Sequence, residues 1–135
     1  MQTKEIQQTE WPAFFDNFSR RHKGSLVNLE IFGSEIGDQI EGRELSLEGI
    51  TAERDKEEGT LLAIMVGAKP DDHITHRIAR PIQVSLEQTD EGVAAALAIK
   101  ATDGTTALLR FPSAVPSFLR LISDEDRTNE DLISS

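Results

Sequence analysis

The feature that most constrains this fold is an aromatic segment near the N-terminus, residues 10–24. Four rings recur there at positions i, i+3, i+4 and i+7: Trp11, Phe14, Phe15 and Phe18. This spacing places them on one stripe of an amphipathic helix. Because only 5% of the chain is aromatic, the stripe is its main source of apolar bulk. We expect it to plug the core of a curved sheet; a helix exposed for docking into a partner is the alternative.

Neighbouring residues mark both ends of this helix. Pro12 is compatible only with a first turn, where its missing N–H would have had no partner. Gly24 can adopt the left-handed conformation that ends a helix. Arg20, Arg21 and Lys23 fall in the last turn, where positive charge complements the helix dipole. A nucleic-acid patch is the other interpretation of these cations, but the run is short and the chain is acidic.

Length and composition describe one small acidic domain. The 135 residues can form one domain with a core and are too few for two. The net charge of −10 disfavours binding to nucleic acid or to anionic lipid. The absence of cysteine excludes disulfides, thiolate nucleophiles and cysteine-ligated zinc. We recognise neither a signal peptide nor a membrane-spanning run, and expect a soluble, cytoplasmic protein of bacterial type.

Alternation of apolar and polar residues predicts β-strands between residues 25 and 111. They should form a curved, mostly antiparallel meander sheet of about six or seven strands, either open or closed into a small barrel. Gly42 indicates a bulge or bend within one strand. Asp103 and Gly104 predict a two-residue hairpin loop, which would pair Ile99 with Leu108.

The two ends of the chain differ from this middle part. Residues 1–8 are polar, and we expect them to be loose. Residues 113–122 predict a short C-terminal helix. Its apolar residues recur at helical spacing: Val115, Phe118, Leu119 and Ile122. Residues 123–135 carry a net charge of −4 and are expected to be disordered. The predicted organisation is therefore a single α+β domain over residues 9–122, with the N-terminal helix packed on the sheet.

Five segments carry a resemblance to a known family: Trp11–His22, Arg43–Ile50, Asp72–His76, Gln88–Gly92 and Thr105–Phe111. In this order they resemble an uncharacterised bacterial family, the domain-of-unknown-function family 5335. The resemblance covers roughly residues 9–111 and implies that they form one domain. Because the family has no assigned activity, the resemblance supplies no catalytic residues.

One polar cluster has the composition of a metal site. Asp72, His73 and His76 provide ligand types that bind divalent metals. Residues three apart on a strand point to opposite faces, so the two histidines could chelate one ion only in a helical or sharply bent segment. His76 also shares the apolar register of Ile74 and Ile78. That register favours a structural, half-buried imidazole, and no cofactor is predicted.

Arginines on strands offer a second candidate site. Arg110 shares the predicted face of Leu108, and a cation among apolar residues usually has a carboxylate partner or a ligand. We interpret it first as a salt bridge. The alternative is an anionic ligand held in a barrel mouth by Arg110, Arg77 and His76. No nucleotide-binding or hydrolase motif is present, so no catalytic residue is nominated.

These observations favour a non-catalytic binding or assembly domain that acts on a protein partner or on a second copy of itself. Phe118, Leu119 and Ile122 are the candidate contact residues; the alternative is that their segment caps one end of the barrel. The alternative is a small-ligand or metal-binding barrel, with weak hydrolytic activity. A closed pocket that holds Arg110 or His76 would favour ligand binding, whereas a flat apolar patch on the outside would favour assembly.

Overall fold

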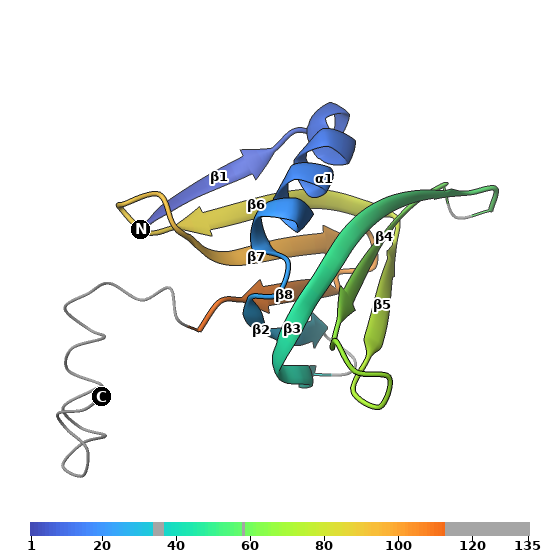
Figure 1. The fold of residues 1–135 in the computed structure, drawn as a ribbon. Helices are drawn as coiled ribbons and strands as arrows, with labels where there is room; N and C mark the ends of the chain where they lie inside the picture. Colours follow the sequence, from blue (N-terminus) through green and yellow to red (C-terminus); the bar gives the residue numbers. More distant parts are fainter. Residues whose placement is uncertain (34–36, 58, 113–135) are drawn as a thin grey trace, which may run out of the picture.

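The structure, a computed structural model, describes residues 1–33, 37–57 and 59–112. The elements along the chain are β1 (Gln2–Ile6), the 3-10 helix η1 (Gln8–Glu10), α1 (Trp11–His22), β2 (Leu26–Gly33), β3 (Gly37–Asp55), β4 (Gly59–Val66), β5 (Ile74–Ala79), β6 (Pro81–Gln88), β7 (Ala94–Ala101) and β8 (Thr106–Arg110). The strands form one sheet in the order β1-β6-β7-β8-β2-β3-β4-β5, and every pair is antiparallel. The predicted α+β class, with an N-terminal helix on a curved sheet, is confirmed (Figure 1).

The long strand β3 bends the sheet. Its first half pairs with β2 and its second half pairs with β4, and the register shifts between Leu47 and Gly49. Figure 1 shows β3 as an arc that connects the β2 side of the sheet to β4 and β5. The predicted irregularity at Gly42 is also confirmed. Gly42 pairs with Leu29, and the β2–β3 register shifts both before and after this pair. One strand therefore belongs to both halves of the sheet.

The curved sheet does not close into a barrel. β1 and β5 are the first and last strands of the order and do not pair with each other. Helix α1 packs against β3 and, in Figure 1, lies between β3 and the β1–β6 side of the sheet. An open curved sheet with a helix in its concave side is therefore the observed form.

The aromatic helix is the core plug that its spacing predicts. Trp11, Phe15 and Phe18 are buried, while Phe14 is half-buried and packs against the same core. Trp11 Nε1 also donates a hydrogen bond of 3.0 Å to the carbonyl oxygen of Ile6. A buried indole N–H needs such a partner. The bond also holds the first residue of α1 against the last residue of β1.

Hydrogen bonds tie the other end of α1 to the bend in β3. Ser19 Oγ donates to the Ile50 carbonyl oxygen (3.1 Å) and accepts from the Ile50 amide (2.9 Å). The Gly24 amide donates to the Leu47 carbonyl oxygen (2.8 Å), and Gly24 adopts the left-handed φ of +89° expected of a helix end. Pro12 lies in the first turn, as predicted. The helix is thus anchored at both ends.

The N-terminal residues correct one prediction. Residues 2–6 form strand β1, which pairs with β6 over its whole length, and are not loose. The sequence pattern misses this strand because only Ile6 is buried and the preceding four residues are exposed. With β1 included, the sheet has eight strands instead of the six or seven expected.

The β7–β8 hairpin differs from prediction by one residue. Its loop consists of residues 102–104, of which Gly104 adopts a φ of +90°. A glycine in the left-handed conformation at the third loop position is typical of three-residue hairpins, which explains why the two-residue loop is not formed. Ile99 therefore pairs with Ala107 instead of Leu108.

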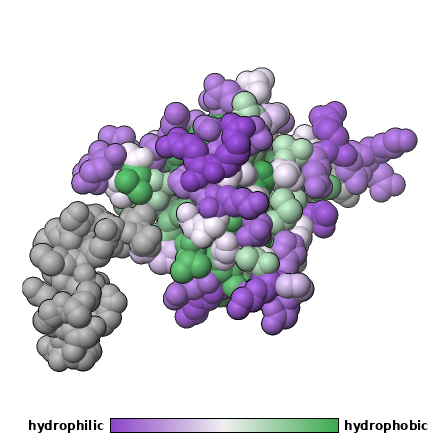
Figure 2. All heavy atoms as spheres, viewed as in Figure 1, coloured by the Kyte–Doolittle hydropathy of each residue, from purple (hydrophilic) through white to green (hydrophobic). Residues whose placement is uncertain are grey.

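The predicted C-terminal helix (residues 113–122) and acidic tail (residues 123–135) lie outside the described residues. In the described ranges, no helix is long and apolar enough to cross a membrane. The face of the molecule seen in Figure 2 is mostly hydrophilic, and hydrophobic residues show on it in small separate groups.

Candidate binding surfaces

The structure does not assemble the predicted metal cluster. Both ring nitrogens of His73 have protein partners: Nδ1 lies 3.0 Å from the Gly67 carbonyl oxygen and Nε2 lies 3.1 Å from Thr75 Oγ1. Asp72 Oδ1 accepts a hydrogen bond from a backbone amide of its own turn. His76 lies on β5, paired with β4. No group of three possible metal-ligating side chains occurs in the part of the chain that the structure describes.

The imidazole of His76 is half-buried beside β4, as its register predicts. Burial lowers its pKa below 6.5, an effect that Glu41 partly offsets. The pKa of His22 is also lowered, first by burial and then by the Arg21 charge. Both rings are therefore held in the neutral form more strongly in the folded chain than in the unfolded chain.

These lowered pKa values predict a loss of stability in mild acid. The unfolded chain takes up protons at His22 and His76 before the folded chain does, so the free energy of unfolding should fall as the pH drops below about 6.5. Urea unfolding at pH 7.5 and pH 5.5 measures this. In the double variant His22→Gln/His76→Gln the difference between the two pH values should shrink; an unchanged difference would contradict the assignment. The pKa values of the Asp90 and Asp103 carboxyl groups are also lowered, but these groups change the free energy of unfolding only at more acidic pH than the histidines do.

The arginines named as ligand candidates form ion pairs on different parts of the sheet. Arg110 Nε lies 3.0 Å from Glu30 Oε2, so a salt bridge is present. The sequence predicts a partner on the core side, but Glu30 and Arg110 lie on the outer face of the sheet. Arg77 Nε lies 3.7 Å from Glu53 Oε1, and both of these side chains are exposed. Strands β2, β3 and β4 separate β8 from β5 in the sheet order. Arg110 is therefore not brought together with Arg77 and His76.

The corrected hairpin register defines an apolar surface on the convex side of the sheet. Leu108 pairs with Glu30 on one side and with Ala98 on the other, and Glu30 pairs in turn with Ile40. Since Leu29, Ile31, Leu97, Ile99 and Leu109 are buried in the core, their sequence neighbours on these strands point outward. We define the outer-face patch as Phe32, Ile40, Ala98 and Leu108.

This patch is unusual for the solvent side of an antiparallel sheet, where polar residues normally alternate with buried ones. Ile40 is 53% exposed, and Phe32, Ala98 and Leu108 are half-buried. The sequence signal for the patch is the weak alternation of β7 and β8, in which Ala98 and Leu108 stand where polar residues are expected. The sequence alone does not assign Ala98 and Leu108 to a face of the sheet, because a register shift of one residue exchanges the two faces.

A second surface is a hollow between α1 and the β6–β7 hairpin, which we call the helix-end cleft. Its volume is about 250 Å³, and its apolar lining includes Phe14, Phe18, Leu86 and Val93. Val93 is 52% exposed. The polar residues of the lining are Asn17, Arg21, His22 and Gln88. This cleft combines aromatic walls with one cationic residue, Arg21.

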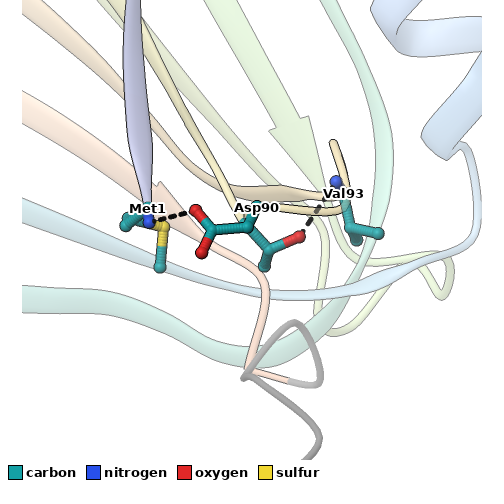
Figure 3. Close-up of polar contacts among 4 residues, drawn as sticks. Met1, Asp90 and Val93 are labelled. Carbon is teal, nitrogen blue, oxygen red and sulfur yellow. Dashed lines mark hydrogen bonds and ion pairs between the residues drawn. The ribbon is translucent and has the colours of Figure 1, made fainter.

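The turn that forms one wall of the cleft is held by a local hydrogen-bond set. Thr89, which is 5% exposed, accepts a hydrogen bond from the Val93 amide at its Oγ1 (3.1 Å). The Met1 ammonium lies 2.7 Å from Asp90 Oδ1, and this hydrogen bond lowers the pKa of the Asp90 carboxyl. Figure 3 shows these contacts on the turn between β6 and β7. The turn that carries Val93 is therefore hydrogen-bonded both within itself and to the N-terminus.

Phe111 links this cleft to the end of β8. Its ring lies 5.1 Å from that of His22 and 5.9 Å from that of Phe18, measured between centroids. The Phe111 amide donates to the Ala95 carbonyl oxygen (2.9 Å). Phe111, one residue before the end of the described range, therefore lies beside the aromatic wall of the cleft.

Together these features define a small α+β domain, an open curved sheet plugged by one aromatic helix, with two separate apolar surfaces. Residues 2–117 match a family described as "Family of unknown function (DUF5335)". The chain belongs to this family, so the resemblance found in the sequence is confirmed and extends to β1 and beyond β8. The chain is also similar to an uncharacterized protein of Aquifex aeolicus (strain VF5). The two are 29% identical over 116 residues, which cover 86% of this chain and 97% of that protein. No solved structure matches the chain.

Proposed function

We propose that this chain is a non-catalytic, cytoplasmic assembly domain that associates with a second copy of itself through the outer-face patch. The observation that carries this proposal is the half-exposed Ile40 near the outward-facing Phe32 and Leu108, on a side of the sheet that normally meets water. Ile40 is the diagonal neighbour of Phe32, and Glu30 lies between Ile40 and Leu108 in the cross-strand row. A group of exposed apolar side chains around a polar pair is a common mark of a protein contact. Two such patches can pack against each other around a two-fold axis.

The charges around the patch favour a copy of the same chain as the partner. Glu30 and Arg110 form an ion pair inside the patch, while Asp38 and Lys100 lie at opposite ends of the row that contains Phe32. These four charges cancel. In a chain with a net charge of −10, repulsion between two copies is weakest where the surface is locally neutral. The four charges within the patch meet this condition, and the further acids of this face, Glu87 and Glu5, lie toward β6 and β1.

Substitution within the patch tests this proposal. We expect native mass spectrometry and light scattering to show a dimer, and Ile40→Lys to weaken its dissociation constant by at least about tenfold, which corresponds to about 1.4 kcal/mol. The lysine would bring two like charges together and remove apolar contact area. The matched control is Val93→Lys, since Val93 is as exposed as Ile40 but lies in the helix-end cleft.

Two results would overturn the assembly proposal. One is a monomer at micromolar concentration for the unchanged chain, or a dimer that Ile40→Lys and Val93→Lys affect equally. The other is extra mass on the monomer that is lost on denaturation, which would identify a bound ligand or metal and favour the small-ligand alternative.

A further inference from the structure

The helix-end cleft is independent of the outer-face patch, and its geometry points to a specific occupant. We propose that it is the docking site for the chain's own residues 113–122, with Phe118 and Leu119 in contact with the aromatic wall. The cleft offers apolar surface on Phe14, Phe18 and Val93. Covering such surface with apolar side chains removes it from water, which is favourable.

The place where the chain leaves the sheet supports this occupant. Phe111 is 8% exposed and contacts both Phe18 and His22, which line the cleft. Residues 113–122 therefore start at the rim of the cleft and need no long connection to reach it. The family match extends to residue 117, so the first part of this segment belongs to the family pattern.

The reach of the segment is sufficient. From Phe111 to Phe118 an extended chain covers up to roughly 23 Å. The twelve residues of α1 span about 18 Å. In the helical form that their spacing predicts for residues 113–122, Phe118 reaches roughly 14 Å from Phe111. That distance covers the part of the cleft lined by Phe18 and His22, whose rings Phe111 contacts.

Charge complementarity distinguishes this occupant from an unrelated peptide. Arg21 lines the cleft and Lys23 follows α1, and neither forms an ion pair with the described part of the chain. Residues 123–135 carry a net charge of −4. These acids directly follow residues 113–122, so attraction to Arg21 and Lys23 would favour the docked segment wherever it brings them within a Debye length of about 10 Å.

Tethering makes the chain's own segment the strongest competitor for the cleft. A short linker gives the attached segment an effective concentration in the millimolar range. Any protein that uses the cleft would have to displace the segment first.

Disulfide trapping in the full chain tests this inference, because the chain contains no cysteine of its own. In the double variant Val93→Cys/Leu119→Cys, mild oxidation should form an intrachain disulfide. The control is Leu26→Cys/Leu119→Cys. Leu26 is 54% exposed and lies two residues from Asn28, which pairs with Arg110, so it is equally close to the chain exit but outside the cleft.

We expect the intrachain disulfide to form at least about tenfold faster in the 93/119 variant than in the 26/119 control, as judged by non-reducing electrophoresis and mass spectrometry. Adding Phe118→Asp to the 93/119 variant should remove that advantage. Equal rates in the two variants would overturn the inference. A 93/119 disulfide found only between two chains would also overturn it, since the cleft would then bind the segment of a second copy.

Discussion

Phe15→Ala should destabilise the domain by about 3–5 kcal/mol, the range for removing a buried aromatic ring from a core. Phe15 is 1% exposed, and its ring is part of the single core cluster formed by α1 and the concave face of the sheet. A loss of this size is a large share of the roughly 5–15 kcal/mol that stabilises a typical domain. Urea unfolding followed by far-ultraviolet circular dichroism measures it, provided that the slope of the transition is unchanged.

Phe14→Ala is the matched control for this prediction. The two rings are neighbours on α1, with centroids 5.2 Å apart, but Phe14 is half-buried and lines the helix-end cleft. Its truncation leaves a smaller cavity, and we expect less than half of the loss seen for Phe15→Ala. Equal losses for the two variants would contradict the core-plug role of the buried ring.

Gly67→Ala should destabilise the domain by about 3 kcal/mol or more. Gly67 follows β4 with a φ of +95°, where an alanine costs about 1–2 kcal/mol. The added Cβ would also overlap the Asp72 carbonyl oxygen and lie 2.7 Å from its carbonyl carbon, so the backbone of the turn would have to move. That movement would disturb the hydrogen bond between His73 and the Gly67 carbonyl oxygen. Thermal and urea unfolding give the loss.

Gly104→Ala separates the two causes of this effect. Gly104 has a similar φ of +90°, but an added Cβ would meet nothing within 4 Å. We therefore expect only the conformational cost, about 1–2 kcal/mol. If Gly67→Ala and Gly104→Ala destabilised the chain equally, the close packing of the β4–β5 turn would not contribute as described.

The two proposed surfaces lie on different parts of the molecule and can be tested separately. The outer-face patch is on the convex side of β2, β3, β7 and β8, whereas the helix-end cleft lies between α1 and the β6–β7 hairpin. Ile40→Lys is expected to affect only self-association, and Phe118→Asp only the occupation of the cleft. A chain that fails one test can still pass the other.

The sequence alone determined the aromatic helix and its place in the core. The spacing of Trp11, Phe14, Phe15 and Phe18 leaves one stripe of bulk in a chain otherwise poor in rings. Pro12 and Gly24 mark the ends of the helix because each restricts or permits a local backbone conformation. Such signals depend on residues a few positions apart, which is why they are readable without a tertiary structure.

Only the tertiary structure decided which residues meet across the sheet. The three-residue loop that ends at Gly104 sets the β7–β8 register. The separate β2–β8 register makes Arg110 the diagonal neighbour of Glu30 on the outer face, where the two form an ion pair. Strand β1 pairs with β6 through its backbone and buries only Ile6. Its sequence therefore shows no alternation of apolar and polar residues that would reveal a strand. Likewise, Phe111 meets His22 only after the chain has crossed the sheet. These contacts join residues far apart in the sequence, so the local pattern could indicate that strands exist but not how they pair.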